Sequence, residues 1–241
     1  MKITAIGAVI VLLGVIVALA PEIPHWRISG TRSTPVEAIA GTDIAPGCPR
    51  QSARVAIIGD SHVAGSRMGG AGAPFGAVLA KTLAGQVEVE RYGIGGATAA
   101  DGARRWQGRD LPEVGLVILA FGTNDAAPRG WLRSKTPVPT SHFKAVMTQM
   151  IEGWRAKGHP VALLAPPPGG SAAITRRLAP YRIAVRELGT SLGVAVLDPA
   201  EAFAACSAAQ PVLTHDALHM NAAGHKCLGE WLAQRLCPQH R

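Results

Sequence analysis

Three residues of this chain have the chemistry of a nucleophilic site. Ser61 lies in "VAIIGDSHVAG" (55–65), directly after a run of apolar residues. Asp216 and His219 lie in "THDALHMN" (214–221), near the other end of the chain. A serine hydroxyl attacks a carbonyl efficiently only when a base takes its proton, and a histidine oriented by a carboxylate is such a base. The residue types and their spacing therefore predict a serine nucleophile with Asp216 and His219 as its partners.

Two further segments offer hydrogen-bond donors for the oxyanion that such an attack creates. Backbone N–H groups are available at Ser61 and in the glycine turn "GIGGAT" (93–98), and "FGTND" (121–125) adds the side-chain amide of Asn124. Loss of one donor of this kind typically raises the barrier by about 3 kcal/mol. Each segment alone is ordinary turn sequence. It is their occurrence together that predicts a catalytic site.

The segments that must position these residues alternate between strand and helix patterns. Apolar runs of strand length predict buried strands, and apolar residues at helical spacing predict amphipathic helices. The expected strands cover 54–59, 86–93, 115–122, 160–166 and 194–198, and the expected helices cover 74–85, 141–158, 172–193 and 221–237. This alternation predicts an α/β fold with three layers, in which a flavodoxin-like, five-stranded parallel sheet lies between helices.

Each candidate segment follows an expected strand. Ser61 follows the first strand, the glycines of 93–98 follow the second, and Asn124 follows the third. Residues 214–221 lie between the last strand and the last helix, for which Asn221 is a suitable N-cap. In sheets of this kind ligands bind beyond the carboxyl ends of the strands. The candidates are therefore expected at one edge of the sheet.

The same segments resemble the signature blocks of a known family. "GDSH", "GIGGAT", "GTND" and "DALH" look like the four blocks of the SGNH (GDSL-type) hydrolases, occur in that family's order and span residues 55–230. The resemblance implies the SGNH hydrolase fold and a serine hydrolase that acts on ester bonds. It also implies that Ser61 is the nucleophile and that Asp216 and His219 complete the catalytic triad.

The resemblance further implies an oxyanion hole formed by the Ser61 N–H, Gly96 and Asn124. The second block is the loosest match, because the family usually has an asparagine shortly before its glycine and this chain has Tyr92-Gly93 there. Gly95 is the alternative to Gly96, and Gly96 before Ala97-Thr98 fits the block better. The family needs no metal or organic cofactor, and none is expected here.

The expected activity is hydrolysis of short acyl esters, O-acetyl in particular, on glycans of the cell envelope or of an exopolysaccharide. An O-acyltransferase would use the same triad and pass the acyl group to a sugar hydroxyl. A lysophospholipase or thioesterase would use it on lipid. The alternative outside the enzymes is a glycan-binding module, which need not retain Ser61, Asp216 and His219 together.

The N-terminus predicts export. After Lys2, the run from Ile3 to Ala20 is uncharged and is close to the roughly 20 apolar residues that cross a hydrocarbon core. Residues 1–20 are therefore expected to be a membrane anchor, or alternatively a cleaved signal peptide, although Pro21 should hinder cleavage. Residues 21–52 are rich in Pro, Gly, Ser and Thr and are expected to link this segment to a hydrolase domain over 53–241, which lies outside the cytoplasm.

The composition of the chain excludes several classes of protein. The chain has 241 residues, 48% hydrophobic and 17% charged, which fits one globular domain rather than a disordered chain. The net charge is +8, yet no Lys/Arg run predicts a nucleic-acid partner. None of the cysteines, Cys48, Cys206, Cys227 and Cys237, forms a CxxC pair of the kind that binds zinc. Disulfides, in any of three full pairings, and buried thiols both remain open.

Overall fold

The computed structural model describes most of the chain after the predicted linker. The described residues are 53–84, 86–111, 114–127, 136–206 and 210–238. The expected anchor or signal segment (1–20), the linker (21–52) and Cys48 lie outside them, so the predicted division of the chain stays a prediction. Within the described residues, no helix is both long and apolar enough to span a bilayer.

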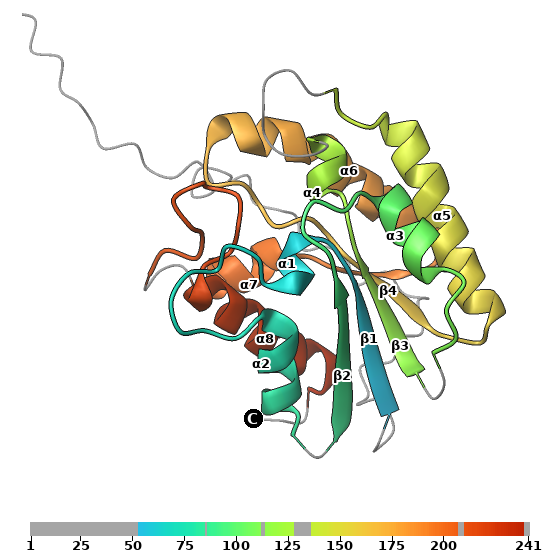
Figure 1. Cartoon of the computed structure of the whole chain (residues 1–241), viewed down its shortest axis with the longest axis horizontal. Helices are drawn as coiled ribbons and strands as arrows, with labels where there is room; N and C mark the ends of the chain where they lie inside the picture. Colours follow the sequence, from blue (N-terminus) through green and yellow to red (C-terminus); the bar gives the residue numbers. More distant parts are fainter. Residues whose placement is uncertain (1–52, 85, 112–113, 128–135, 207–209, 239–241) are drawn as a thin grey trace, which may run out of the picture.

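A five-stranded parallel sheet forms the centre of the molecule (Figure 1). Its strands are β1 (Ala53–Gly59), β2 (Val87–Gly93), β3 (Val114–Ala120), β4 (Val161–Leu164) and β5 (Ala195–Leu197). Their order is β2-β1-β3-β4-β5, and every neighbouring pair is parallel. The predicted flavodoxin-like α/β fold is thereby confirmed, and all five strands end within two residues of the expected bounds.

Helices cover each face of this sheet. The described helices are α1 (Ser61–Ala64), α2 (Phe75–Thr82), α3 (Ala99–Trp106), α4 (Thr123–Ala126), α5 (Thr140–Ala156), α6 (Ala172–Leu192), α7 (Pro199–Cys206) and α8 (Ala222–Leu236). α2, α7 and α8 pack together on one face, and α3, α5 and α6 lie on the other (Figure 1). α1 and α4 are single turns that begin just beyond the ends of β1 and β3.

The core is divided by the sheet into two apolar clusters. Ile58 belongs to the cluster beneath α3, α5 and α6, whereas its neighbour Ile57 belongs to the cluster beneath α2, α7 and α8. Successive strand residues point to opposite faces, so a strand covered on both sides must be apolar throughout. This is why the central strands β3 and β4 read as continuous apolar runs, whereas the edge strand β2 also carries charged residues.

Local details of the helices differ from the sequence prediction. The sequence also offers Ser141 as the N-cap of the helix expected over 141–158, but α5 begins at Thr140 with Pro139 at the N-cap, so that prediction is wrong. Proline has a φ suited to the start of a helix and lacks only an N–H that the first turn leaves unpaired. Gly158, the last residue of the range expected for this helix, adopts φ +82 just after α5, a left-handed conformation that commonly ends a helix. α6 runs continuously through Pro180.

A disulfide joins α7 to α8 through Cys206 and Cys227, two residues with a sequence separation of 21. The loop that it closes contains Asp216 and His219. Closing a loop of this length restricts the unfolded chain and stabilises the fold by about 3 kcal/mol on the chain-entropy account.

We therefore expect Cys206→Ala, Cys227→Ala and the double variant each to lose about 3 kcal/mol of unfolding free energy. The three losses should be nearly equal, because each substitution removes the same cross-link. Urea unfolding without reductant measures them. Wild-type midpoints in all three variants would contradict the stabilising role of this bond.

Candidate active site

Ser61, His219 and Asp216 form a connected chain of hydrogen bonds. The Nε2 atom of His219 lies 3.1 Å from the Oγ atom of Ser61. Its Nδ1 atom lies 2.7 Å from the Oδ2 atom of Asp216. The serine side is buried and the carboxylate side is partly open, since side-chain exposure is 12% for His219 and 33% for Asp216. The structure thus brings together the three residues that the sequence singles out.

The segment that carries Asp216 and His219 is a short hairpin closed by backbone hydrogen bonds. Leu213 and Met220 form an antiparallel bridge, and the Thr214 N–H donates to the His219 carbonyl at 2.8 Å. Asn221 then caps α8, accepting from the Gly224 N–H at 2.9 Å, as predicted. The hairpin and the cap fix the carboxylate and the imidazole relative to α8.

The Asp216 carboxylate accepts several hydrogen bonds besides the one from the imidazole. Its Oδ1 atom accepts from the Leu218 and His219 N–H groups, each at 2.9 Å, and from the Thr214 hydroxyl at 2.7 Å. Burial by itself would raise the pKa of Asp216, but these hydrogen bonds outweigh it and hold the pKa well below its usual value. The group is therefore an anion whenever His219 needs a partner for its Nδ1–H.

The nucleophile is presented by the single turn α1 directly after β1. The Asp60 side chain caps this turn by accepting from the His62 N–H at 2.9 Å, and Gly65 ends it at φ +73. A Cβ atom on Gly93, at the end of β2, would lie only 2.2 Å from the Ala64 backbone nitrogen. The glycine therefore allows α1 to sit tightly against β2, which sets the position of Ser61.

Of the expected oxyanion residues, Gly96 lies on the loop after β2 and Asn124 lies in α4, and a hydrogen bond joins these two segments. The Asn124 Nδ2 atom donates to the Ala97 carbonyl at 3.0 Å, which leaves its second N–H for another acceptor. Gly96 adopts φ +80, a conformation that favours glycine, and is exposed on the loop after β2. This conformation favours Gly96 over Gly95 as the glycine that the second block requires.

Asp125 joins α4 to the start of α3. Its carboxylate oxygens lie 3.1 and 3.2 Å from the Ala99 N–H at the start of α3, and its side chain is buried. Burial raises the pKa of Asp125 to about 7. Burial also raises the pKa of Asp60 to about 7, despite hydrogen bonds from the His62 N–H and the Thr123 hydroxyl. Each carboxyl is therefore easier to protonate near neutral pH than an exposed aspartate.

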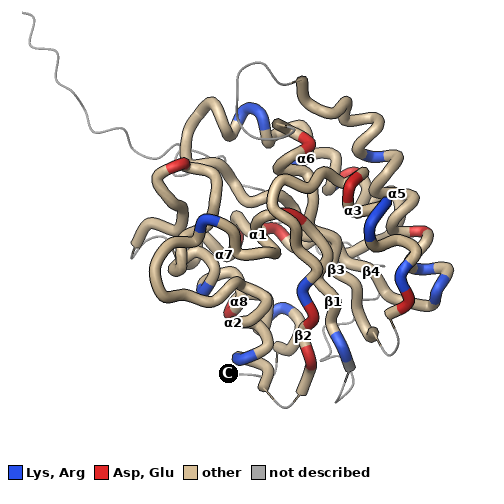
Figure 2. The backbone as a smooth tube through the Cα atoms, viewed as in Figure 1, with Lys and Arg blue, Asp and Glu red and all other residues tan. Residues whose placement is uncertain are grey.

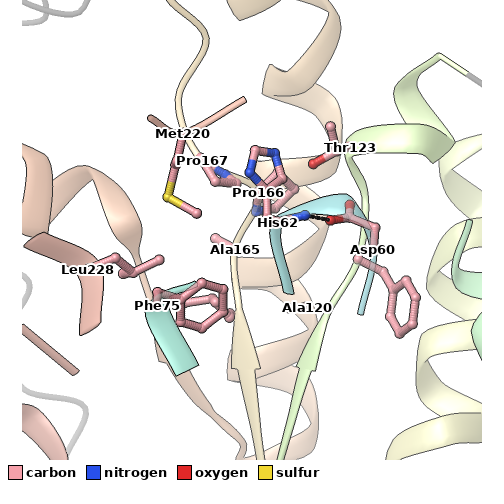
Figure 3. Close-up of a pocket in the computed structure, with 12 residues that line it drawn as sticks. Asp60, His62, Phe75, Ala120, Thr123, Ala165, Pro166, Pro167, Met220 and Leu228 are labelled. Carbon is pink, nitrogen blue, oxygen red and sulfur yellow. Dashed lines mark hydrogen bonds between the residues drawn. The ribbon is translucent and has the colours of Figure 1, made fainter. Parts of the chain in front are cut away.

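His62 follows the nucleophile in the chain and is buried. Figure 3 shows its ring among the residues that line a small pocket. Neither ring nitrogen has a hydrogen-bond partner among the described residues. The ring faces a cavity of about 10 Å³ bordered by Asp60, Phe75 and Met220, and its centroid lies 5.5 Å from that of His219. Burial, with repulsion from His219 and His225, lowers the pKa of His62 to about 3. The ring beside the triad is therefore neutral.

The buried carboxyls and histidines have opposite effects on stability as the pH changes. Asp60 and Asp125 have pKa values of about 7 in the folded protein against 3.8 when exposed, so they bind protons more tightly in the folded state. Their contribution to the free energy of unfolding therefore falls as the pH rises from 3.8 to about 7. His62 and His225, with pKa values lowered to about 3 and about 4 from 6.5, bind protons more tightly when unfolded. The contribution of these two histidines to the free energy of unfolding is fully present above pH 6.5 and falls as the pH drops below it.

We expect His62→Leu to remove the pH-dependent contribution of His62 to stability and to leave those of the other three groups. The leucine leaves no buried polar atom unpaired, so it should match or exceed wild-type stability at pH 7. Because the wild type must protonate the exposed imidazole on unfolding below pH 6.5, the advantage of the variant should grow by about 2 kcal/mol between pH 7 and pH 5. Urea unfolding at the two pH values measures it. A difference between the two proteins that stays the same at both pH values would contradict the burial of a neutral His62.

Several residues around the site have no distinctive signal in the sequence. Asp125 and Asp60 are indistinguishable from turn residues until the fold buries them, and Thr214 gives no sign that it will bond Asp216. α3 is different, because the capping box of Thr98 and Asp101 marks its start and could have been recognised. Among the described residues, no group of three or more His, Cys, Asp or Glu side chains is arranged to hold a metal ion.

Known proteins resemble this chain in sequence and in fold. The GDSL-like Lipase/Acylhydrolase family matches residues 57–227, which contain all five candidate residues. A G-D-S-L family protein from Desulfitobacterium hafniense DCB-2 is 25% identical, with 77% of this chain and 100% of that chain covered and a TM-score of 0.62. No curated protein matches the chain.

Two other solved structures share the fold at lower identity. A lipase/acylhydrolase from Enterococcus faecalis is 23% identical, with 76% of this chain and 95% of that chain covered and a TM-score of 0.63. An acetylxylan esterase from Geobacillus stearothermophilus is 19% identical, with coverage of 78% and 95% and a TM-score of 0.64. The chain belongs to the GDSL-like lipase/acylhydrolase family, the SGNH hydrolases. It is a carboxylic ester hydrolase.

Proposed function

We propose that this hydrolase removes short acyl groups, O-acetyl in particular, from glycans, and that it does so through an acyl-enzyme on Ser61. The observation that carries the mechanism is the continuous contact from Ser61 Oγ through the His219 ring to Asp216, with distances of 3.1 and 2.7 Å. A serine, a histidine and a carboxylate in this order are the parts that nucleophilic catalysis on an ester requires.

Acylation begins when Ser61 Oγ attacks the ester carbonyl carbon and its proton passes to His219 Nε2. The carbonyl oxygen becomes an oxyanion, which accepts hydrogen bonds from the N–H groups of Ser61 and Gly96 and from the free N–H of the Asn124 amide. The Asp216 carboxylate stabilises the imidazolium through its bond to Nδ1. When the tetrahedral intermediate collapses, the bond to the alcohol oxygen breaks and His219 returns its proton to that oxygen.

Deacylation repeats these steps with water. His219 Nε2 takes a proton from a water molecule as its oxygen attacks the acyl carbon, and the same donors hold the new oxyanion. Collapse breaks the bond to Ser61 Oγ, which regains a proton from His219. The products are the carboxylic acid and the free enzyme, so no redox partner or cofactor enters the balance.

Two features support a small acyl group on a glycan. The sequence has no long apolar insertion between its four blocks, whereas a lipase that binds long chains needs an apolar wall or lid. A structural neighbour from Geobacillus stearothermophilus is an acetylxylan esterase. The proposal extends that class of substrate, an acetylated polysaccharide, to this chain.

Rates on a series of p-nitrophenyl esters from acetate to dodecanoate test the acyl preference. We expect kcat/KM to be highest for acetate or propionate and to fall beyond butyrate. Acetate release from acetylated polysaccharide should follow, at a rate unaffected by added glycan acceptors. A steep rise with chain length would instead favour lipid, and acceptor-dependent acyl transfer would favour an O-acyltransferase.

We also propose that the domain acts outside the cytoplasm, held by an N-terminal anchor. The uncharged run from Ile3 to Ala20 supports this, as does the Cys206–Cys227 disulfide, since such bonds persist mainly in oxidising compartments. The full-length protein should sediment with membranes, and protease added to spheroplasts should digest the domain. Recovery in the soluble cytoplasmic fraction, protected from protease, would contradict this location.

A further inference from the structure

An open groove adjoins the loop that carries Gly96. It has a volume of about 450 Å³, within the roughly 300–1,000 Å³ range of ligand sites. One wall is the loop after β2, from Ile94 to Ala97, and the other is the outer face of α3, with Asp101, Arg104 and Arg105. A substrate whose carbonyl oxygen lies at Gly96 therefore has this groove directly beside it.

The groove has a surplus of positive charge. Its two arginines face one carboxylate, and α3 carries both basic and acidic segments in Figure 2. Asp101 is already engaged, because it accepts from the Thr98 N–H and hydroxyl at 2.9 and 2.8 Å and pairs with Arg104. Arg105 is exposed and has no ion-pair or hydrogen-bond partner in the part of the chain that the structure describes. Its guanidinium is the group available to a ligand.

The surroundings define the chemistry of that ligand. A guanidinium binds a carboxylate through two parallel hydrogen bonds, a geometry that a lysine cannot match. The apolar side chains of the groove are only Ile94 and Ala97, which is too little to hold a lipid chain. A polar substrate with a negative charge close to the acylated hydroxyl fits better, and the net charge of +8 adds attraction to a polyanion.

We propose that this groove binds a uronic acid residue of the acylated glycan, with Arg105 as the ligand of its carboxylate. The proposal rests on the function proposed above and names its substrate class, an O-acetylated acidic polysaccharide. The carboxylate lies on the sugar that bears the acetyl group or on its neighbour, because the groove begins at the oxyanion loop itself. Arg104 remains paired with Asp101 and shapes the wall.

The test compares O-acetylated oligogalacturonides with the same oligosaccharides after reduction of their carboxyl groups. We expect wild-type kcat/KM for acetate release to be about tenfold higher on the acidic form, mainly through a lower KM. Raising the salt from about 0.1 M to about 1 M should shrink this ratio, as the Debye length falls from about 10 to about 3 Å. Arg105→Gln should bring the ratio close to one.

Arg109→Gln is the matched control, because Arg109 is also an exposed arginine near the end of α3 but does not line the groove. It should keep the wild-type ratio. Equal wild-type rates on the acidic and the reduced oligosaccharides would overturn the proposal, and so would the same acidic-to-reduced ratio of kcat/KM in both variants. Hydrolysis of p-nitrophenyl acetate in either case would still support the proposed esterase activity. An Arg105-dependent preference for lysophospholipid over the acidic oligosaccharides would overturn it in favour of a lipid headgroup. Inactivity on every ester would instead contradict the proposed function.

Discussion

Ser61→Ala is expected to lower kcat on p-nitrophenyl acetate by roughly 10⁴- to 10⁶-fold. Without the hydroxyl no acyl-enzyme forms, and only the oxyanion donors remain to assist attack by water. In the described part of the chain, the Oγ atom bonds only His219, so its removal costs the fold about 1 kcal/mol. The variant should therefore unfold at nearly the wild-type denaturant concentration.

Ser66→Ala is the matched control for this variant. Ser66 follows α1, and its N–H donates to the Ser61 carbonyl at 2.9 Å, but among the described residues no hydrogen bond joins its side chain to His219 or Asp216. It should keep activity within a few-fold of wild type. Turnover by a well-folded Ser61→Ala protein at the wild-type rate would remove Ser61 from the mechanism.

Asp216→Asn is expected to lower kcat by roughly 10³- to 10⁴-fold. The asparagine has nearly the shape of the aspartate, but the contact of 2.7 Å with Nδ1 would now involve a neutral amide. If the amide nitrogen donates there, the imidazole proton moves to Nε2 and His219 can no longer accept the Ser61 proton. In either orientation the anionic charge that stabilises the imidazolium is gone.

The pH dependence gives a second readout for Asp216→Asn. Hydrogen bonds keep the Asp216 pKa well below its usual value, so the charge of this group should not limit the wild type above pH 5. The acidic limb of the wild-type kcat/KM profile should therefore not arise from protonation of Asp216. The same kinetics with Asp110→Asn, an exposed carboxyl in the segment that follows α3, should match wild type. A fall in kcat of less than tenfold in Asp216→Asn would show that the carboxylate is dispensable for catalysis.

The sheet and the candidate site follow from the sequence because each depends on a strong local pattern. Buried parallel strands must be apolar on both faces, and the turn residues that follow β1 and β3 then fall at one edge. Ser61 and His219, far apart in the chain, meet there because the topology leaves them no other edge. The spacing of the residues alone does not assign a role to each of them. The resemblance of the four blocks to the SGNH family, in that family's order, supplies those roles.

What the sequence does not show depends on short-range geometry and on burial. α1 and α4 are single turns, too short for any periodic pattern, and their formation depends on packing beside the strand ends. The neutral state of His62 arises because the fold buries it, although in the sequence it is one residue of a turn. The pairing of Cys206 with Cys227 likewise requires α7 and α8 to lie side by side.

The most direct test of the proposed mechanism is the covalent labelling of Ser61. The protein is treated with diisopropyl fluorophosphate, digested and analysed by mass spectrometry. We predict one adduct per chain, on the peptide that contains Ser61, formed much more slowly in His219→Ala because no base takes the serine proton. An adduct on another residue, or labelling of Ser61 at the same rate in His219→Ala, would contradict the assembly of these side chains into a working nucleophile.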